Sequence, residues 1–218
     1  MILERSILLA LLQLVDRLPM PAVPPHRGRP MVYSHRLFVK ALVVRVVRPV
    51  PTVHALLALV EPPTMEMRQV RAALTEAGHY PSRRTWERRL ATIPATLPAQ
   101  IACLGHHLVA VLVPWPTGGH AAAIDSTVLR AKGGVWHKKH REAGEVPHTS
   151  IDTEAHWTKS GWHGWVYGWK LHLVTTVAAV WLPLAADLTP ANAADNEVAP
   201  ALIADLPPAV RFLLGDTS

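Results

Sequence analysis

Residues 121–129 read Ala-Ala-Ala-Ile-Asp-Ser-Thr-Val-Leu, and an apolar run interrupted by one carboxylate predicts a buried β-strand. The 130–164 segment that follows is polar and rich in Trp, Lys and His, which predicts a long loop or an irregular hairpin. Beyond it, the sequence predicts three strands and, before the last of them, a helix: strands 165–176, 180–188 and 210–214, helix 195–205. An antiparallel opening followed by a helical crossover predicts a mixed sheet, with the last strand parallel to the first and beside it.

This order of elements brings two aspartates together. Asp125 lies within the first strand, and Asp216 follows the last strand 91 positions later. If the two strands are neighbours, both carboxylates lie at one place in the sheet, and carboxylates are the hard oxygen ligands that Mg²⁺ or Mn²⁺ requires. Two such ions about 3.5–4 Å apart can support in-line displacement at a phosphodiester. The alternative is that Asp125 is an ordinary strand-end residue and Asp216 an ordinary turn residue.

The first half of the chain is helical in its periodicity and strongly basic. Residues 1–120 hold 14 Lys and Arg against 6 Asp and Glu, a net charge of +8, whereas residues 121–218 hold 8 against 10, a net of −2. A single cysteine, Cys103, excludes an internal disulfide framework and a cysteine-based zinc cluster. The sequence therefore predicts an α+β protein with two domains: a helical DNA-binding region over residues 1–117 and a sheet domain over residues 118–218.

Residues 64–91 have the outline of a helix-turn-helix unit. Thr64 is predicted to cap a helix that reaches Ala77, with Gly78 at its C-cap, and Ser82 to cap a second helix. In the second helix, the apolar side chains are predicted to pack inward while four arginines face DNA: Arg83, Arg84, Arg88 and Arg89. An ordinary solvated basic helix is the alternative, and the +8 charge of the region favours DNA.

Four segments in the same order resemble the DDE transposases of bacterial insertion sequences: Ile124–Thr127, Gly168–His172, Leu188–Asn192 followed by Asp195, and Leu214–Asp216. The resemblance implies a ribonuclease-H-like catalytic domain in which Asp125 and Asp216 are the first and second acidic metal ligands. The family's third ligand is a glutamate on a helix downstream of the second aspartate, and these 218 residues contain no such position. We therefore expect an incomplete ribonuclease-H-like sheet and a C-terminally truncated transposase that is inactive as an isolated chain.

The same resemblance implies the partners and the cofactor. The cofactor is Mg²⁺ or Mn²⁺, bound as two ions in a complete family member and weakly or not at all here. The partner is double-stranded DNA, as transposon terminal repeats and target DNA, together with a possible homo-multimer. The expected location is the cytoplasm, in association with the nucleoid, and no membrane partner is expected because the apolar run from Ser6 to Val15 is shorter than the about 20 residues that span a bilayer.

Other functions and other residues leave alternatives open. The chain could be a non-catalytic DNA-binding fragment or inhibitor that recognises transposon ends, or, less well supported, a nuclease of the same fold. Lys170 could contact a phosphate or be a snorkelling edge lysine. Six of the eight tryptophans lie between residues 136 and 181, where they could stack on unpaired bases or pack beneath the long loop. The pair His137 and His140 has lysines between its members, which favours a solvated loop over a zinc site.

Overall fold

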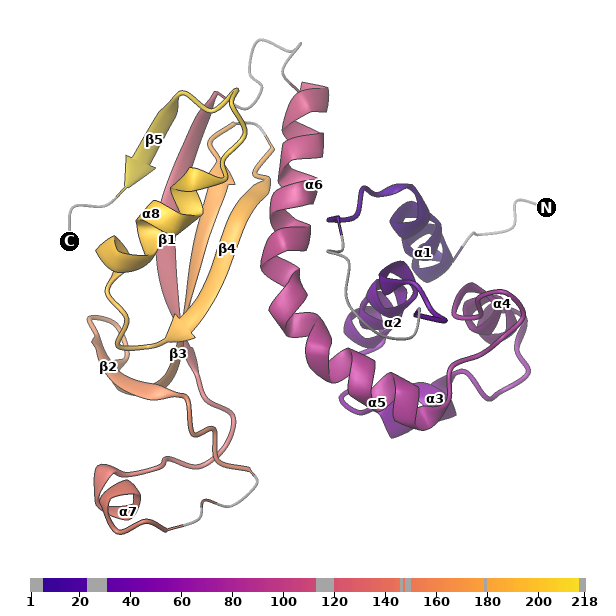
Figure 1. The fold of residues 1–218 in the computed structure, drawn as a ribbon, viewed down its shortest axis with the longest axis horizontal. Coiled ribbons are helices and arrows are strands. Elements are labelled where there is room, and N and C mark those ends of the chain that lie inside the picture. The colour runs from indigo at the N-terminus through magenta and orange to yellow at the C-terminus, as the bar shows by residue number, and fades with distance from the viewer. Residues whose placement is uncertain are drawn as a thin grey trace. The chain divides into compact units, whose positions relative to one another are not determined.

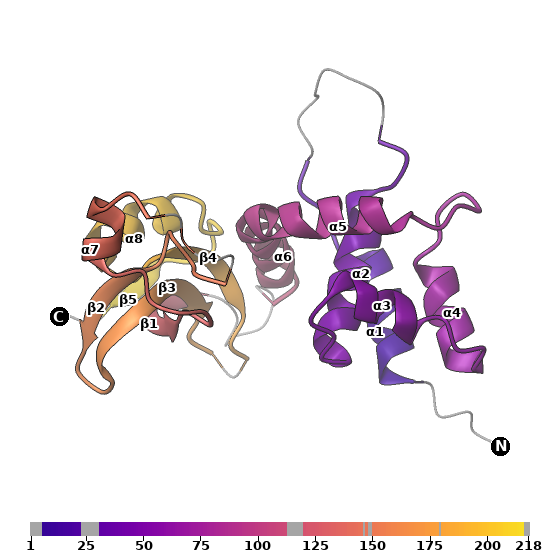
Figure 2. The ribbon, with the colours of Figure 1, turned by 90° about the horizontal axis from the view of Figure 1, so that it is seen from below.

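The structure is a computed structural model that describes residues 6–22, 31–112, 120–145, 147, 150–178 and 180–215 (Figures 1 and 2). The chain divides into two compact units, Met1–Gln100 and Ile101–Ser218. The predicted boundary between residues 117 and 118 falls among residues that are not described. It stays a prediction, and the compact units divide instead within a helix.

The first unit consists of helices that gather around one core (Figure 2). The helices are α1 (Ile7–Arg17), α2 (His35–Val47), α3 (Val53–Leu59), α4 (Met65–Ala73), α5 (Arg83–Thr92), the 3₁₀ turn η1 (Ile93–Thr96) and α6 (Leu97–Leu112), which continues into the second unit. Four of these helices have a hydroxyl side chain at the N-cap, which accepts a hydrogen bond from a backbone amide of the first turn. The capping residues are Ser34, Thr52, Thr64 and Ser82.

The centre of this core is Trp86, which is fully buried, as the sequence predicts. Its ring meets the ring of Phe38 edge-on, with centroids 5.2 Å apart and planes at 76°. Leu90, one turn further along α5, is buried as well. The spacing of four residues therefore gives α5 one inward face.

The helix that starts at Thr64 ends earlier than the sequence predicts. It stops at Ala73, not at Ala77. Glu76 and His79 exchange both backbone hydrogen bonds, at 3.0 and 2.9 Å, across a two-residue turn in which Ala77 and Gly78 have φ of 48° and 78°. Gly78 thus serves a tight turn between the two helices and does not cap the first of them.

The second unit is a five-stranded mixed sheet with helix α8 (Asp195–Ala204) packed against it. The strands are β1 (Ala121–Arg130), β2 (His156–Ser160), β3 (Gly164–Thr176), β4 (Pro183–Pro190) and β5 (Phe212–Gly215). β1 pairs antiparallel with β3 and parallel with β5, as predicted. β3 also pairs antiparallel with β2 along its first residues and with β4 along its later ones.

The segment predicted as a long loop or irregular hairpin holds two regular elements. These are the short helix α7 (Lys138–Glu142) and β2, which forms a hairpin with β3, so that the sheet has five strands and not four. Side chains alternate between the two faces along a strand. On one face, Ala122 and Val174 form a core together with Leu202 of α8. The other face carries Asp125.

Candidate active site

Asp125 lies in the middle of β1 with a neighbouring strand on each side. It is opposite Leu173 of β3, and on the other side Gly215, the last residue of β5, is opposite Ile124. The predicted adjacency of the first and last strands is therefore confirmed. Asp216 is the next residue in the sequence and lies outside the described residues.

The carboxylate of Asp125 is exposed, on the sheet face that α8 does not cover. Its Oδ1 accepts a hydrogen bond from the backbone amide of Ser126 at 2.7 Å. Asp125 also borders a pocket of about 350 Å³, which α8 and β5 help to form; its other lining residues are Ile124, Ser126, His172, Asp195, Asn196, Ala199 and Gly215. An exposed carboxylate beside a hollow is open to a ligand from solvent.

A polar cluster joins the start of α8 to β3 and β4 at this pocket. His172 is only 2% exposed, and its Nε2 lies 2.8 Å from the Thr189 hydroxyl while its Nδ1 lies 3.1 Å from Oδ1 of Asp195. Burial lowers the pKa of His172, and the nearby Asp195 carboxylate acts in the opposite direction. The imidazole is buried against the first residue of α8 and positions it through this contact.

Lys170 belongs to the same cluster. Its Nζ donates to the backbone oxygen of Ala193 at 2.8 Å and lies 3.4 Å from Asp195. Through these contacts the lysine holds the turn that precedes α8 in place. Its predicted contact with DNA phosphate remains a prediction.

The sequence predicts Asp195 as the cap of the helix that follows it, and this is wrong: Ala194 is at the N-cap, and Asp195 is the first residue of α8, where its carboxylate meets Lys170 and His172. The contact between His172 and Asp195 was not predicted. The alternation Lys-x-His in a predicted strand was the available signal, because it places both side chains on one face. That the face is the one covered by α8 follows only from the sheet.

Gly168 explains the first position of the Gly-Trp-Lys-Leu-His segment. It is opposite Arg130 of β1 and His156 of β2, and a Cβ added there would lie 2.0 Å from the backbone oxygen of Leu129. Only glycine permits the two backbones to approach so closely where β1 ends.

Residues 116–217 match the family model described as "Transposase DDE domain". Residues 116–217 therefore carry a transposase DDE domain. The family and the ribonuclease-H-like fold predicted from the four sequence segments are thereby confirmed. No significant similarity to a curated protein or to a solved structure was found.

Members of this family share a broad chemistry. DDE transposases bind DNA and generally use a divalent metal ion, and they are generally cytoplasmic. One continuous helical stretch, Arg83–Leu112, is long and apolar enough to cross a membrane by length and composition alone. It begins with the arginines of α5, and its Val109 packs in the core of the sheet unit; core helices of soluble proteins meet the same criterion.

The donor chemistry at β1 suits a hard divalent ion. Among the described residues, no group of three or more His, Cys, Asp or Glu side chains is placed to hold a metal. Asp125 itself is exposed, and its carboxylate has the Ser126 amide as its only hydrogen-bond donor within the described ranges. An oxygen ligand of this kind fits Mg²⁺ or Mn²⁺ once a second carboxylate lies beside it.

The four arginines of α5 differ in their surroundings. Arg83 pairs with Glu87 at 2.7 Å. Arg89 is half-buried, with its guanidinium 4.9 Å from the centre of the Phe38 ring, and burial lowers its pKa. Arg84 and Arg88 are exposed, and neither makes an ion pair with another described residue. These two are therefore the arginines most available to DNA, while Arg89 departs from the outward orientation that the sequence suggested.

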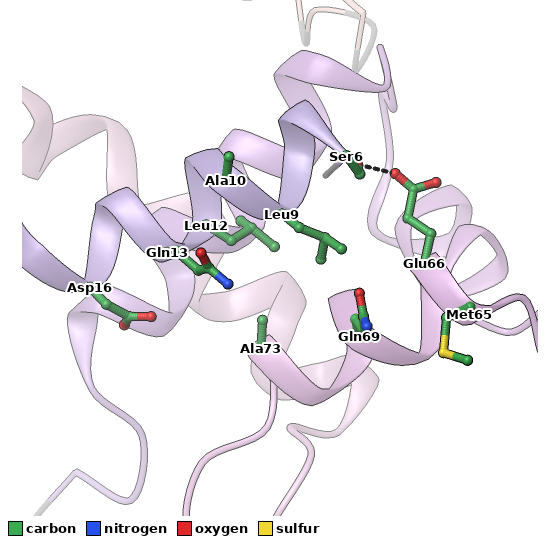
Figure 3. Close-up of a pocket in the computed structure, with 10 residues that line it drawn as sticks. All are labelled: Ser6, Leu9, Ala10, Leu12, Gln13, Asp16, Met65, Glu66, Gln69 and Ala73. Carbon is green, nitrogen blue, oxygen red and sulfur yellow. Dashed lines mark hydrogen bonds between the residues drawn. The ribbon is translucent and has the colours of Figure 1, made fainter. Parts of the chain in front are cut away.

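The other helix of the helix-turn-helix unit is held by Glu66 (Figure 3). Its carboxylate accepts from the hydroxyl of Ser6 and pairs with Arg48 at 2.8 Å, and the Ser6 hydrogen bond is the main cause of its lowered pKa. A mainly apolar groove between α1 and α4 runs from this contact past Leu9 and Gln69. Glu66 thus fixes α4 to two neighbours.

Proposed function

We propose that the chain is an insertion-sequence transposase that recognises transposon terminal repeats and carries the carboxylates for divalent-metal-dependent DNA cleavage and strand transfer. The observation that carries the proposal is the position of Asp125: exposed, central in the sheet, and one register position from the end of β5. Asp216 follows that end in the sequence.

In this proposal Asp125 and Asp216 hold Mg²⁺ or Mn²⁺. The ions, when bound, activate the attacking hydroxyl or water and stabilise the leaving oxygen. Asp125, which is opposite Leu173 on β3 and one position beyond the last described pair with β5, and Asp216 would supply carboxylate oxygens to the ions. The His172–Asp195 contact keeps the start of α8 in place at the pocket that Asp125 borders.

The arginines of α5 supply the DNA contact. Arg84 and Arg88 project from a helix whose opposite side is anchored by Trp86 and Leu90. Arg83 and Arg89 already have partners within the protein, Glu87 and the Phe38 ring. They would contact DNA only if these contacts are given up or shared with the DNA. Phosphate and guanine edges are the groups that arginine recognises best.

A second candidate is a DNA-binding form without cleavage. The helical half is strongly basic, and its exposed Arg84 and Arg88 on α5 can meet DNA without any contribution from the sheet. We propose that this polypeptide on its own binds terminal-repeat DNA without cleaving it efficiently. It would then act as an inhibitor of a complete relative by occupying the same ends.

The test uses the DNA that flanks the coding frame as substrate. The purified chain, its Asp125→Asn variant and the control Asp205→Asn are assayed for binding, for Mn²⁺ affinity by calorimetry, and for nicking in Mg²⁺ or Mn²⁺. Asp205 is an exposed residue at the C-terminal end of α8. We expect all three proteins to bind the DNA, only Asp125→Asn to lose Mn²⁺ affinity, and none to nick.

Each other outcome has a meaning. Strong nicking that requires Asp125 supports the catalytic function and contradicts the inactivity of the isolated chain. Mn²⁺ affinity that survives Asp125→Asn contradicts the metal assignment. Failure to bind the flanking DNA contradicts the proposed function as a whole.

A further inference from the structure

The hairpin formed by β2 and β3 exposes three tryptophans. Trp162 at its tip is 96% exposed, Trp165 is 67% exposed and Trp157 is 40% exposed. Other tryptophans of this region are engaged: Trp169 donates its Nε1–H to Asp152 at 2.7 Å, and Trp136 packs against the small core around Tyr167. The loop therefore shelters two tryptophans and leaves Trp162 and Trp165 in solvent, while the half-exposed Trp157 packs on one side against the Tyr167 ring, with centroids 5.5 Å apart.

The charge of the hairpin is positive only. Residues 156–165 read His-Trp-Thr-Lys-Ser-Gly-Trp-His-Gly-Trp and contain no Asp or Glu. Lys159 is exposed and lies directly opposite Trp165. Aromatic faces interleaved with cations are the arrangement that binds unpaired nucleotides, because bases stack on the rings while the cations meet the phosphates.

The hairpin and Asp125 share one face of the sheet. Asp125 is opposite Leu173, and the period of two along β3 puts Leu173 and Trp165 on the same side. Trp157 and Lys159 are opposite Tyr167 and Trp165 and so share that side as well. A DNA strand lying on this face would meet both the carboxylate and the tryptophans.

The loop that follows β1 is basic and is attached to this face. Asp152 anchors the loop over this face, since it accepts hydrogen bonds from Tyr167 and Trp169 at 2.7 Å each. Residues 130–145 of the loop hold five Lys and Arg against two Glu, a net charge of +3. Figure 1 shows α7 and β2 together at the end of the sheet where β3 begins.

From Trp165 to Leu173 the chain advances eight residues, which is about 27 Å in a strand. Nucleotides advance about 3.4 Å along each strand of double-stranded DNA, and unpaired nucleotides extend further. The hairpin would therefore engage bases several nucleotides from the phosphate at Asp125, at a distance where it binds DNA without taking part in the chemistry.

We propose that the β2–β3 hairpin is a stacking site for unpaired bases of the DNA substrate, formed by Trp157, Trp162 and Trp165 with Lys159. This inference rests on the proposed function, because the DNA that supplies the bases is the transposase's own substrate. It adds a site for single-stranded DNA that is separate from the α5 arginines.

The experiment measures binding by fluorescence anisotropy to two probes: a short blunt duplex, and the same duplex with an oligo(dT) tail. The full chain is compared with a Trp162→Ala/Trp165→Ala double variant. The matched control is Trp181→Ala, which removes a tryptophan from the segment between β3 and β4 whose exposure (76%) lies between those of Trp162 and Trp165. Circular dichroism checks that the variants keep the fold.

We expect the wild-type chain and Trp181→Ala to bind the tailed probe more tightly than the blunt one. The double variant should lose about 10-fold or more in affinity for the tailed probe, since each stacked base contributes about 1–3 kcal/mol, and keep its affinity for the blunt duplex. Quenching of tryptophan fluorescence by oligo(dT) should fall in the double variant and persist in the control.

Three results would overturn the inference while leaving the proposed function intact: no preference for the tailed probe, an equal loss in Trp181→Ala, or an equal loss on both probes. A tail preference that does not depend on Trp162 and Trp165 would also contradict the inference. If binding to anionic lipid vesicles depends on these two residues instead, the hairpin is a membrane site; if self-association depends on them, it contacts a second copy of the chain. A wild-type chain that binds neither probe nor the flanking DNA would instead contradict the proposed function.

Discussion

At the scale of single residues, the most constrained ionisable group of the sheet unit is His172. It is buried between Thr189 and Asp195, and the charged groups that act on it are Asp195, Lys170 and Asp187. Burial is the largest of these influences and lowers its pKa, so the folded protein binds its proton less readily than the unfolded chain does.

That shift predicts a pH dependence of stability. Below the unfolded-state value of about 6.5, the unfolded chain takes up a proton that folded His172 resists, so stability is lost as pH falls from about 6.5 through the lowered folded value. Thermal unfolding measured at several pH values should show a smaller loss in His172→Gln than in the wild type. An equal loss in both would mean that other histidines cause it, and His35, whose pKa is also lowered by burial, is the next to test.

At the scale of elements, glycine decides how β1 and β3 meet. Gly168→Ala would place a Cβ 2.0 Å from the oxygen of Leu129 and 2.9 Å from the amide nitrogen of Ala131, both backbone atoms of the β1 end. We expect a loss of about 3 kcal/mol or more in the free energy of unfolding, because the backbone cannot move aside cheaply. Urea denaturation measures it.

The matched control for this substitution is Gly161→Ala in the hairpin turn. A Cβ there meets no heavy atom within 4 Å, so its effect should stay within about 0.5 kcal/mol. If the two variants were equally stable, the close approach of β1 and β3 would not be the reason for glycine at position 168.

The turn between α4 and α5 offers the opposite case, a substitution that should stabilise. Ala77 has a φ of 48°, a left-handed conformation that costs alanine about 1–2 kcal/mol and that asparagine adopts more readily. Asn-Gly is also the preferred pair for a turn with two such residues. Ala77→Asn should therefore raise the melting temperature of the helical unit, and a lower melting temperature would contradict this account of the turn.

At the scale of the whole molecule, the two compact units have unequal cores. Among the described residues, the helical unit gathers fifteen buried hydrophobic side chains in one cluster, whereas the sheet unit has clusters of six and three. In the sheet unit, β5 is hydrogen-bonded to β1, but its Phe212 and Leu214 side chains are exposed to solvent. Apolar surface buried against protein is the main source of stability, so the sheet unit should be the less stable one.

Hydrogen exchange measured by mass spectrometry tests this difference. We expect the amides of β5 to exchange fastest among the strands, and those around Trp86 on α5 to exchange slowest in the chain. Limited proteolysis should cut in the sheet unit first. A protected fragment that spans the sheet and excludes the helices would contradict the prediction.

The sequence by itself determined the family resemblance and the order of most elements, whereas α7 and β2 were predicted only as a loop or an irregular hairpin. Ile-Asp-Ser-Thr, Gly-Trp-Lys-Leu-His and the Thr-Pro-Ala-Asn turn are local patterns, and the strands around them follow from alternation and from proline and glycine. The caps at Ser34, Thr52, Thr64 and Ser82 are local too, because a hydroxyl that bonds an amide three residues on needs no distant partner. The early end of α4 was not predicted, because Ala77 adopts a left-handed backbone conformation that an alanine in the sequence does not indicate.

What the tertiary structure decided is which residues share a face. The sequence contains Lys170, His172 and Asp195, but only the pairing of β3 with its neighbours and the packing of α8 bring them into contact. Likewise, the alternation of a single strand does not say which tryptophans the loop shelters. Side-chain facing is set by strand register and by which surface another element covers, and both depend on contacts between residues far apart in the chain.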